Sequence, residues 1–558
     1  MHIVGIHLDQ ASGEGQNRTF VQAGILAGAS IVVRIIGLLY RSPLTAIIGD
    51  EGNGYYGLAY NIYTIVLLIS SYSIPSAISK IMAEKLALEH YKSARRVFVC
   101  ALFYALAAGL AASLFLFFAA PVLVPATSVP VLRVFAPTIF IFGILGVLRG
   151  FFQAHRTMMP TSVSQILEQL ANAIVSIAAA WLLIQTVRET MPAKAPLYGA
   201  IGSALGTGAG VLIALLFMAW CYLVNVDLLK NRIYSDKTEP ESYRSIMIQT
   251  VRNITPFIMS SFILNLTTSL NQTIYIKMMI NTHGADEIAV TTMYGLFSNK
   301  AVVITNIPIS IATAVSAAII PGISTAFARG DLDETRSRCR NANRMTFMIA
   351  MPCTIGLMVF AWPVTLLLFP QMMTLETASS LLAVLSITVV FYSVSTVTNA
   401  VLQGIGRMHM PLVSAGIALV IQTVLLVLLV RYTDMGIYSL VLVSIIYSVL
   451  IFIFNMLFIR KYLKVREDVL GDYALPLLAS MIMGVGSITL YIIIFKLASL
   501  SVSSLYFVNV IAIFPSIIVA IMLYFFVLIR FGVIGTDDFL ALPKGRFIVR
   551  VLRRLRWI

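Results

Sequence analysis

Long apolar stretches alternate with short polar stretches along almost the whole chain, from about residue 20 to residue 530. These apolar stretches reach the ~20 residues that an α-helix needs to cross a bilayer. The pattern therefore predicts an all-α polytopic membrane protein with about fourteen transmembrane helices. The expected spans are residues 20–40, 55–79, 97–120, 129–152, 162–187, 198–224, 248–276, 292–320, 345–369, 377–402, 411–430, 437–460, 475–497 and 505–530.

Basic residues are distributed unequally between the two sides that these spans define. When residues near a span end are counted with the adjoining loop, 30 of the 39 Lys and Arg residues belong to the segment before the first span, to loops after even-numbered spans or to the C-terminal segment. Eight belong to loops after odd-numbered spans, and Arg34 lies inside the first span. Cytoplasmic loops carry the excess of Lys and Arg in membrane proteins. The bias predicts a multi-pass protein with both termini in the cytoplasm, which requires an even number of spans.

Composition narrows the classes of function. Apolar residues make up 59% of the chain and charged residues 11%, against roughly 45–50% and 25% in soluble proteins. This balance excludes a soluble enzyme, a disulfide scaffold, a disordered chain and a β-barrel porin. The four cysteines and six histidines are scattered, and no nucleotide-binding or hydrolase motif is present. We expect no metal, no cofactor and no ATP hydrolysis, and the net charge of +15 indicates membrane orientation rather than nucleic-acid binding.

Two polar segments recur at a nearly constant offset. Residues 77–95 and 318–336 both run from an apolar helix end into a charged helical segment, 241 residues apart. Residues 153–160 and 403–411 form a second pair at a similar offset. Because six spans separate the members of each pair, the two halves have parallel topology. The repeat predicts two parallel six-helix bundles plus two C-terminal helices, an architecture in which transporters bind substrate between the halves.

The predicted spans and loops divide the chain into five parts. The last part places Ile548, Val551, Leu552 and Leu555 on one helical face and arginines on another, a pattern typical of basic amphipathic helices at an anionic leaflet. The parts are an N-lobe of spans 1–6 (1–225), a cytoplasmic linker (226–247), a C-lobe of spans 7–12 (248–465), spans 13 and 14 (466–535) and the basic tail (536–558).

Two arginines of the first span are the leading candidates for substrate binding. Arg34 lies within the span and Arg41 follows seven residues later, two helical turns on, so both side chains can point the same way. Ionisable groups within spans face a cavity or a partner, and guanidinium groups bind phosphate bidentately. We expect an anion site with phosphate as the ligand. The alternative is a structural ion pair for Arg34 and an Arg41 side chain that extends to the membrane surface.

A polar stripe marks the fifth span. Gln165, Glu168, Gln169 and Asn172 recur at intervals of three and four residues and therefore share one helical face. Glu168 is the carboxylate that we place deepest in a span. The stripe predicts either the lining of a cavity or a hydrogen-bonded seam between helices.

Polar residues of the seventh and eighth spans complete the candidate site. Lys300 is a third candidate cation, either facing the arginines across the interface between the bundles or extending outward from a helix end. No catalytic residue is expected. The predicted substrate-binding residues are Arg34, Arg41, Lys300, Glu168, Gln165, Asn172, Asn265 and Asn306.

Three motifs carry a family resemblance: Arg34–Arg41 (RIIGLLYR) followed by Gly49–Tyr56 (GDEGNGYY), then Ser71–Ser79 (SYSIPSAIS), and Pro160–Gln169 (PTSVSQILEQ). Together they resemble the stage V sporulation protein B-like polysaccharide-biosynthesis branch of the multidrug/oligosaccharidyl-lipid/polysaccharide (MOP) exporter superfamily. This branch includes the MurJ-type lipid II flippases of Gram-positive bacteria. The resemblance implies a bacterial plasma-membrane protein whose cationic cavity takes a pyrophosphate-linked sugar, and the span-1 arginines of MurJ-type proteins match Arg34 and Arg41.

The resemblance also implies a cargo and a mechanism. Spans 13 and 14 would form a groove for a polyprenyl tail, and alternating access would move the headgroup across the bilayer. Lipid II for peptidoglycan synthesis is the first cargo to consider, followed by teichoic acid, capsule or exopolysaccharide precursors. The implied partners are the lipid-linked glycan, membrane lipids and cell-wall synthases. Two other functions stay open: a MATE-type cation or drug antiporter, which needs cavity carboxylates, and a scaffold that recruits cell-wall synthases without transport.

Overall fold

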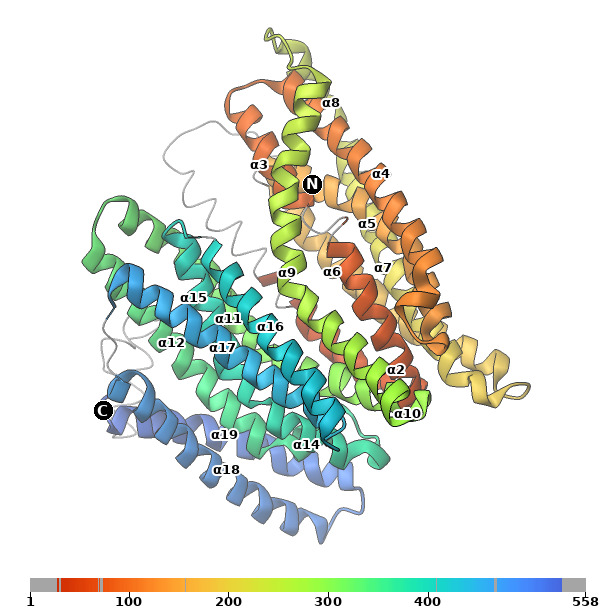
Figure 1. Ribbon diagram of the computed structural model, residues 1–558, viewed down its shortest axis with the longest axis vertical. Coiled ribbons are helices and arrows are strands. Elements are labelled where there is room, and N and C mark those ends of the chain that lie inside the picture. The colour runs from red at the N-terminus through yellow and green to blue at the C-terminus, as the bar shows by residue number, and fades with distance from the viewer. Residues whose placement is uncertain are drawn as a thin grey trace. The chain divides into compact units, whose positions relative to one another are not determined.

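The computed structural model is almost entirely helical, and no strand occurs among the residues it describes. These are residues 28–29, 32–68, 70, 74–155, 157–407, 409–465 and 469–533. The chain divides into two compact units, which meet in the sequence between Gly295 and Leu296. Figure 1 colours the first unit from red to yellow-green and the second from green to blue.

Long helices joined by short connections build the first unit. Four of them carry proline as their first or second residue, where the missing N–H breaks no helical hydrogen bond. In chain order the helices are Val32–Leu39, α2 (Arg41–Leu67), α3 (Ile74–Ala87), α4 (Tyr91–Leu123), α5 (Val129–Ala154), α6 (Met159–Val187), α7 (Ala195–Val224), α8 (Val226–Ser235), α9 (Tyr243–His283) and α10 (Glu287–Gly295).

Small residues permit the closest helix packing in this unit. Gly202, Gly206 and Gly210 recur every four residues on α7 and face α6, where Ala180 and Ser176 approach them. A side chain at Gly206 would overlap the backbone of Ser176. Helices in a membrane gain no hydrophobic stabilisation from contact, because lipid is as apolar as their side chains. Small residues let the backbones approach closely, and the resulting van der Waals contacts hold the helices together. On the other side of α7, α5 and α4 run alongside one another (Figure 1), and the core fills the space between these helices, α2 and α3.

The second unit continues the helical pattern with several broken helices. Its C-terminal pair, α18 and α19, packs on α12 and α13, where Asn509 Nδ2 donates to the Pro363 carbonyl oxygen at 3.0 Å. The elements are η4 (Leu296–Ala301, a π-helical turn), α11 (Val302–Ala328), α12 (Leu332–Val359), α13 (Ala361–Leu368), η5 (Met372–Thr374), α14 (Leu375–Leu385), α15 (Ile387–Gly404), α16 (His409–Tyr432), α17 (Tyr438–Leu463), η6 (Val469–Ala474), α18 (Leu475–Ser499) and α19 (Leu505–Arg530).

The polytopic all-α fold expected from the hydrophobic pattern is confirmed. Within the described residues, ten helices are long and apolar enough to cross a membrane, or up to twelve if each of two bent pairs forms one span. The expected number is about fourteen, and the difference has identifiable causes. The expected span 20–40 begins outside the described residues, and the span 55–79 is divided between α2 and α3. The helix α9 is long enough to span a membrane, but its many Asn, Gln, Ser and Thr residues make it too polar to be counted.

The first two expected spans meet at a tight turn rather than a loop. Helical structure runs on past the predicted end at residue 40 as far as Ile48, and Gly49 then adopts φ 71° and ψ 175° inside α2. A positive φ is readily accessible only to glycine, so this residue lets the chain reverse without an intervening loop. The consequence is that Arg41 lies within a helix, not in the loop after the first span.

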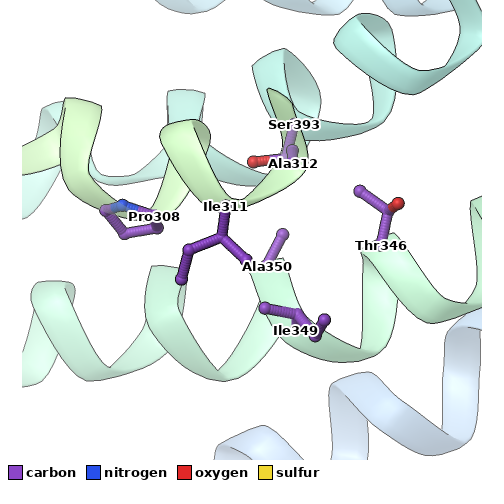
Figure 2. A pocket seen from close by; sticks show the side chains of 7 residues that line it. All are labelled: Pro308, Ile311, Ala312, Thr346, Ile349, Ala350 and Ser393. Atoms are coloured by element: carbon purple, nitrogen blue, oxygen red, sulfur yellow. The ribbon is translucent and has the colours of Figure 1, made fainter. Parts of the chain in front are cut away.

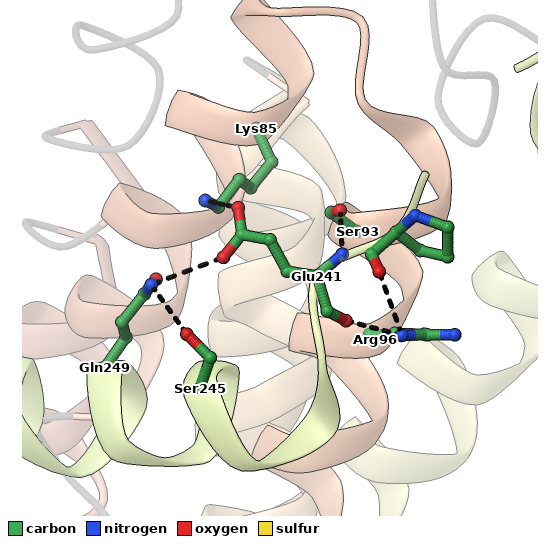
Figure 3. Close-up of polar contacts among 7 residues, drawn as sticks. Lys85, Ser93, Arg96, Glu241, Ser245 and Gln249 are labelled. Carbon is green, nitrogen blue, oxygen red and sulfur yellow. Dashed lines mark hydrogen bonds and ion pairs between the residues drawn. The ribbon is translucent and has the colours of Figure 1, made fainter. Parts of the chain in front are cut away.

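The predicted linker is partly helical and is fixed to the first unit. After α8, residues 236–242 lie across the ends of α3 and α4 (Figure 3), where Glu241 pairs with Lys85 and its backbone N–H donates to Ser93 Oγ at 3.1 Å. Arg96 donates to the carbonyl oxygen of Pro240 at 3.2 Å. The ion pair with Lys85 lowers the pKa of Glu241 below its usual value. The linker therefore joins α9 to α3 and α4 through charge-assisted contacts.

The boundary between the compact units differs from the predicted boundary between the lobes. The sequence places the break in the linker 226–247, whereas α9 and α10 belong to the first unit. The reason is contact: α9 packs on α3 and α4, and α10 packs on α2. Gly54 of α2 and Gly295 of α10 let these two backbones come together, because neither residue has a side chain to separate them. The division into lobes at 226–247 stays a prediction.

Candidate substrate-binding site

The two arginines of the first span lie on either side of a helix break. The segment Val32–Leu39 and α2 are bent by 44° at Tyr40. Arg34 is exposed and Arg41 is half-buried. Continuous helical spacing would align the two side chains, and the bend alters that alignment. The structure therefore gives the two cations different surroundings.

Glu168 of α6 is paired with Arg149, near the end of α5. Arg149 Nη2 lies 2.7 Å from Glu168 Oε2, and Arg149 Nε donates to Ser164 Oγ at 3.0 Å. The arginine is 6% exposed, whereas the Glu168 side chain keeps 24% of its surface accessible. The pair neutralises the deep carboxylate of the first unit and leaves one edge of it accessible.

The rest of the polar stripe on α6 is largely enclosed by the first unit. Asn172 is 9% exposed and lies 3.4 Å from the Tyr40 hydroxyl through Nδ2, while its Oδ1 accepts from Ser176 Oγ at 2.9 Å. Gln165 is half-buried, and its Oε1 atom has no hydrogen-bond partner within the described part of the chain. Asn172 thus takes part in a seam between helices, whereas Gln165 keeps an unused acceptor.

A chain of polar contacts connects this stripe to α2. Thr207 of α7 lies 3.5 Å from Asn172 Oδ1 and 3.4 Å from the Tyr56 hydroxyl, at the long end of the hydrogen-bond range. In the described part of the chain, Arg41 forms no ion pair with a carboxylate.

Lys300 is enclosed within the second unit. The residue is 1% exposed, and its Nζ donates to Gln371 Oε1 at 3.1 Å and to Thr374 Oγ1 at 3.2 Å. The ammonium group also lies 5.7 Å from the centre of the Phe369 ring. The π-helical turn η4 carries this side chain toward the connection between α13 and α14. Substrate binding by Lys300 stays a prediction. The contacts that the structure shows attach this side chain to the connection between α13 and α14.

The two remaining candidate residues contribute less to this picture. Asn306 of α11 is exposed, and the side chain of Asn265 in α9 lies outside the described residues. A small pocket with a cavity volume of about 10 Å³ lies between α11, α12 and α15 (Figure 2). Pockets for organic ligands usually measure roughly 300–1,000 Å³, so this one is too small for a lipid headgroup. Its lining is Pro308, Ile311, Ala312, Thr346, Ile349, Ala350 and Ser393.

Comparison with known proteins supplies the family. The model of the family described as "Polysaccharide biosynthesis protein" matches residues 22–327, more than half of the chain, and the MatE model matches residues 256–428. The chain belongs to the polysaccharide biosynthesis protein family. Within the MOP superfamily, its relatives place it in the branch of MurJ and stage V sporulation protein B.

Two relatives from Bacillus subtilis (strain 168) are similar to this family member over most of their length. Lipid II flippase MurJ is 25% identical over 425 residues, which are 73% of this chain and 76% of the relative. Stage V sporulation protein B is 26% identical over 470 residues, 82% of this chain and 87% of the relative. These similarities and the apolar helices establish a multi-pass membrane protein.

Solved structures agree on the fold. The inward closed conformation of lipid II flippase MurJ matches with a TM-score of 0.64 and 14% identity, covering 91% of this chain and 98% of that structure. An inward-facing multidrug resistance MATE family transporter matches with a TM-score of 0.59 and 17% identity, covering 77% and 95%. At these identities the likeness concerns the fold alone, which is that of the MOP superfamily.

Two features of this polysaccharide biosynthesis family member escaped the sequence analysis. Arg149 lies inside the predicted span 129–152, and an arginine at that depth was a usable signal because such residues require a partner. The tyrosines of α2 gave a weaker signal, since Tyr56, Tyr60 and Tyr63 follow helical spacing but are also common as packing residues.

Proposed function

We propose that this protein is a flippase that moves a polyprenyl-pyrophosphate-linked saccharide from the cytoplasmic to the outer leaflet by alternating access. It is thus a transporter rather than an enzyme. Lipid II for peptidoglycan synthesis is the cargo that we propose first, because one relative is a lipid II flippase and is 25% identical over three quarters of its length. Teichoic acid, capsule or exopolysaccharide precursors share the same pyrophosphate linkage and are the next candidates.

The observation that carries this proposal is the charge arrangement of the first unit. Glu168 is neutralised by Arg149, whereas Arg41 forms no ion pair with a carboxylate among the described residues. A pyrophosphate cannot enter roughly 30 Å of hydrocarbon without cations that replace its hydration. A guanidinium binds phosphate through two parallel N–H donors. Arg41, with Arg34 across the bend, is the group that we assign to the pyrophosphate.

The same arrangement disfavours a MATE-type cation antiporter, although MATE proteins share the fold. Such a protein needs a carboxylate that exchanges a proton for a cationic drug. The carboxylate of Glu168 is already paired with a buried arginine at 2.7 Å, so its charge is neutralised before a cationic drug could bind to it. We therefore propose an anionic headgroup and place the candidate residues Gln165, Asn172, Asn265 and Asn306 among its uncharged contacts.

Orientation and organisation complete the proposal. The excess of basic residues in even-numbered loops places both termini in the cytoplasm of a bacterial cell. The N-lobe (1–225) and the C-lobe (248–465) would alternate in access on the two sides, joined by the linker 226–247. Cell-wall synthases would then receive the translocated lipid at the outer surface.

The test is complementation of a missing flippase. A bacterium depleted of its own lipid II flippase receives this protein or its Arg34→Ala/Arg41→Ala variant, and externally accessible lipid II is measured. We expect the wild type to restore accessible lipid II and the variant to fail at equal membrane abundance. If both proteins restored accessible lipid II, lipid II would stand as the cargo, but Arg34 and Arg41 would not be needed to bind it. Failure of an abundant wild type would exclude lipid II, and the same assay would then be run with other polyprenyl-linked glycans.

A further inference from the structure

Two cations lie over one tyrosine ring at an end of the second unit. Arg407 follows α15, and its Cζ atom lies 4.7 Å from the centre of the Tyr462 ring. Lys461, in the last turn of α17, places its Nζ atom 5.8 Å from the same centre. The Tyr462 hydroxyl donates to Met410 Sδ of α16 at 3.8 Å, which orients the ring between the two helices. Two positive groups are therefore held around one aromatic side chain.

The connection after α15 fixes the backbone of Arg407 and leaves its side chain available. Gly406 adopts φ 77° at the end of the helix, and the Arg407 N–H donates to the Leu402 carbonyl oxygen at 2.8 Å. Arg407 is exposed, and among the described residues its guanidinium donates no hydrogen bond and forms no ion pair. An arginine that lies over a ring is restrained by that contact while its N–H donors stay free to bind an anion.

The charge around these two cations is positive. Arg460 and Lys464, near the end of α17, are exposed, and neither forms an ion pair in the part of the chain that the structure describes. The first turn of α12 lies at the same end, because Arg336 donates to a carbonyl oxygen of α17 at 2.7 Å. Its carboxylates, Asp333 and Glu334, each pair with an arginine of α12. They therefore leave the cations of α15 and α17 uncompensated.

Exposed apolar rows lead along the helices to these cations. On α17, Ile453 and Leu457 are exposed and precede Lys461 at intervals of four residues, so all three share one face. On α16, which packs beside α17 (Figure 1), Val413 and Ile417 are exposed at the same spacing. Both helices are long and apolar enough to cross a membrane. In a bilayer, the rows contact acyl chains and the helix ends reach the headgroups.

We propose that Arg407 and Lys461 bind the headgroup of an anionic phospholipid. The phosphate accepts hydrogen bonds from the guanidinium and the ammonium group, and the acyl chains lie along the apolar rows of α16 and α17. Tyr462 holds the two cations at the level of the headgroups, where tyrosine is common in membrane proteins. This lipid is a resident of the membrane, so the site is independent of the cargo proposed above.

Other anions make different predictions. A soluble phosphate compound has no acyl chains and would gain nothing from the exposed apolar rows. A polyprenyl pyrophosphate is both anionic and apolar, so it shares the chemistry of the proposed ligand. The two lipids can be distinguished by competition, because a site for a resident phospholipid should not be emptied by the cargo.

The experiment measures which lipid lies beside Lys461 in the full-length protein. Leu457→Trp places a single tryptophan one helical turn from Lys461, in a background in which the four natural tryptophans are replaced by phenylalanine. The protein is reconstituted in phosphatidylcholine bilayers. Fluorescence quenching by phosphatidylglycerol with brominated acyl chains is compared with quenching by brominated phosphatidylcholine. The comparison gives the relative binding constant of the two lipids at this position.

The test variant is Arg407→Gln/Lys461→Gln in the same background. The matched control is Arg431→Gln, because Arg431 is also exposed and its Cζ atom lies 5.7 Å from the centre of a tyrosine ring, that of Tyr432. In the described structure no second cation shares that ring. A thermal unfolding midpoint equal to that of the background protein confirms that each variant is folded. A parallel sample contains an excess of undecaprenyl pyrophosphate.

We expect the background protein to bind phosphatidylglycerol about tenfold more tightly than phosphatidylcholine at this position. The double variant should lose this preference, whereas Arg431→Gln and undecaprenyl pyrophosphate should leave it unchanged. Equal binding of the two lipids by the background protein, or an unchanged preference in the double variant, would overturn the site. Displacement of phosphatidylglycerol by undecaprenyl pyrophosphate would assign the two cations to the cargo, which overturns the phospholipid site while the flippase function stands.

Discussion

The guanidinium of Arg149 and the carboxylate of Glu168 form an ion pair between α5 and α6, 19 residues apart in the sequence, with 2.7 Å between Nη2 and Oε2. Two charges that are costly to bury separately are tolerated together, because each supplies what the other loses from water. The pair also neutralises the charge of Glu168, and under the proposed function Arg41 is then the group that attracts the anionic headgroup.

Breaking this pair on one side should destabilise the protein. Arg149→Gln leaves Glu168 partly buried beside an uncharged amide, and loss of one partner of a buried pair costs roughly 3–5 kcal/mol. Because the Glu168 side chain is 24% accessible, we expect the lower end of that range. The measurement is the thermal unfolding midpoint in detergent micelles, which should fall for Arg149→Gln.

The double variant Arg149→Gln/Glu168→Gln is the control. Two glutamines can bond to each other without any buried charge, so most of the lost stability should return. If the double variant lost as much stability as the two single changes combined, the two residues would not act as a pair.

A second prediction concerns the contact between α6 and α7. Gly206→Ala places a methyl group in the backbone of Ser176, and overpacking of this kind costs roughly 1–3 kcal/mol. The control is Gly416→Ala in α16, where no heavy atom lies within 4 Å of the added carbon. That change should be neutral or slightly stabilising, since alanine favours a helix over glycine. Equal unfolding midpoints for the two variants would show that the α6–α7 contact is looser than described.

How far the sequence predicted this arrangement depends on whether a feature is local. The helices follow from runs of apolar residues, which is why most expected spans coincide with observed helices. The bend at Tyr40 was not predicted, although the sequence holds a cause for it: Pro43 cannot donate the helical hydrogen bond to the Leu39 carbonyl oxygen. The pairing of Arg149 with Glu168 is a tertiary contact between two helices. The sequence indicates that each of these charged residues requires a partner within the membrane, but it does not show which residue that partner is.

The unit boundary illustrates the same limit. Composition identified a polar linker, and polar linkers commonly separate domains. It could not show that Glu241 would meet Lys85, or that the linker would thereby fix α9 to α3 and α4. Charged residues in a linker predict exposure to water, but which opposite charges they meet depends on the fold.

A third prediction concerns this linker and pH. Asp236 Oδ2 accepts from the backbone N–H of Lys92 at 2.8 Å and so caps α4, whose own N-cap residue, His90, provides no side-chain bond. This bond, with those from Thr238, lowers the pKa of Asp236 to about 2 from its usual 3.8. A lowered pKa means that the linker contact is complete above about pH 4 and is lost as the pH falls toward 2.

Ser93, which is 1% exposed beneath the linker, can report its release. In a background with no other cysteine, Ser93→Cys is treated with a dithiodipyridine, which reacts with thiols in acid. We expect protection from neutral pH down to about pH 4 and rapid reaction near pH 2. Asp236→Asn should react at neutral pH, because the amide is a weaker acceptor than the carboxylate. Full protection of Asp236→Asn at neutral pH would show that the other linker contacts suffice.

The last prediction separates two roles for Lys300. Its ammonium group is buried and donates to Gln371 and Thr374, so Lys300→Met should remove both hydrogen bonds and cost roughly 1–3 kcal/mol of stability. Binding of undecaprenyl pyrophosphate to the folded variant should then remain close to wild type, because the charge is enclosed within the second unit. Unfolding midpoint and dissociation constant are measured on the same preparation. If the variant had normal stability but bound undecaprenyl pyrophosphate many times more weakly, Lys300 would be a substrate-binding residue, as the sequence predicts.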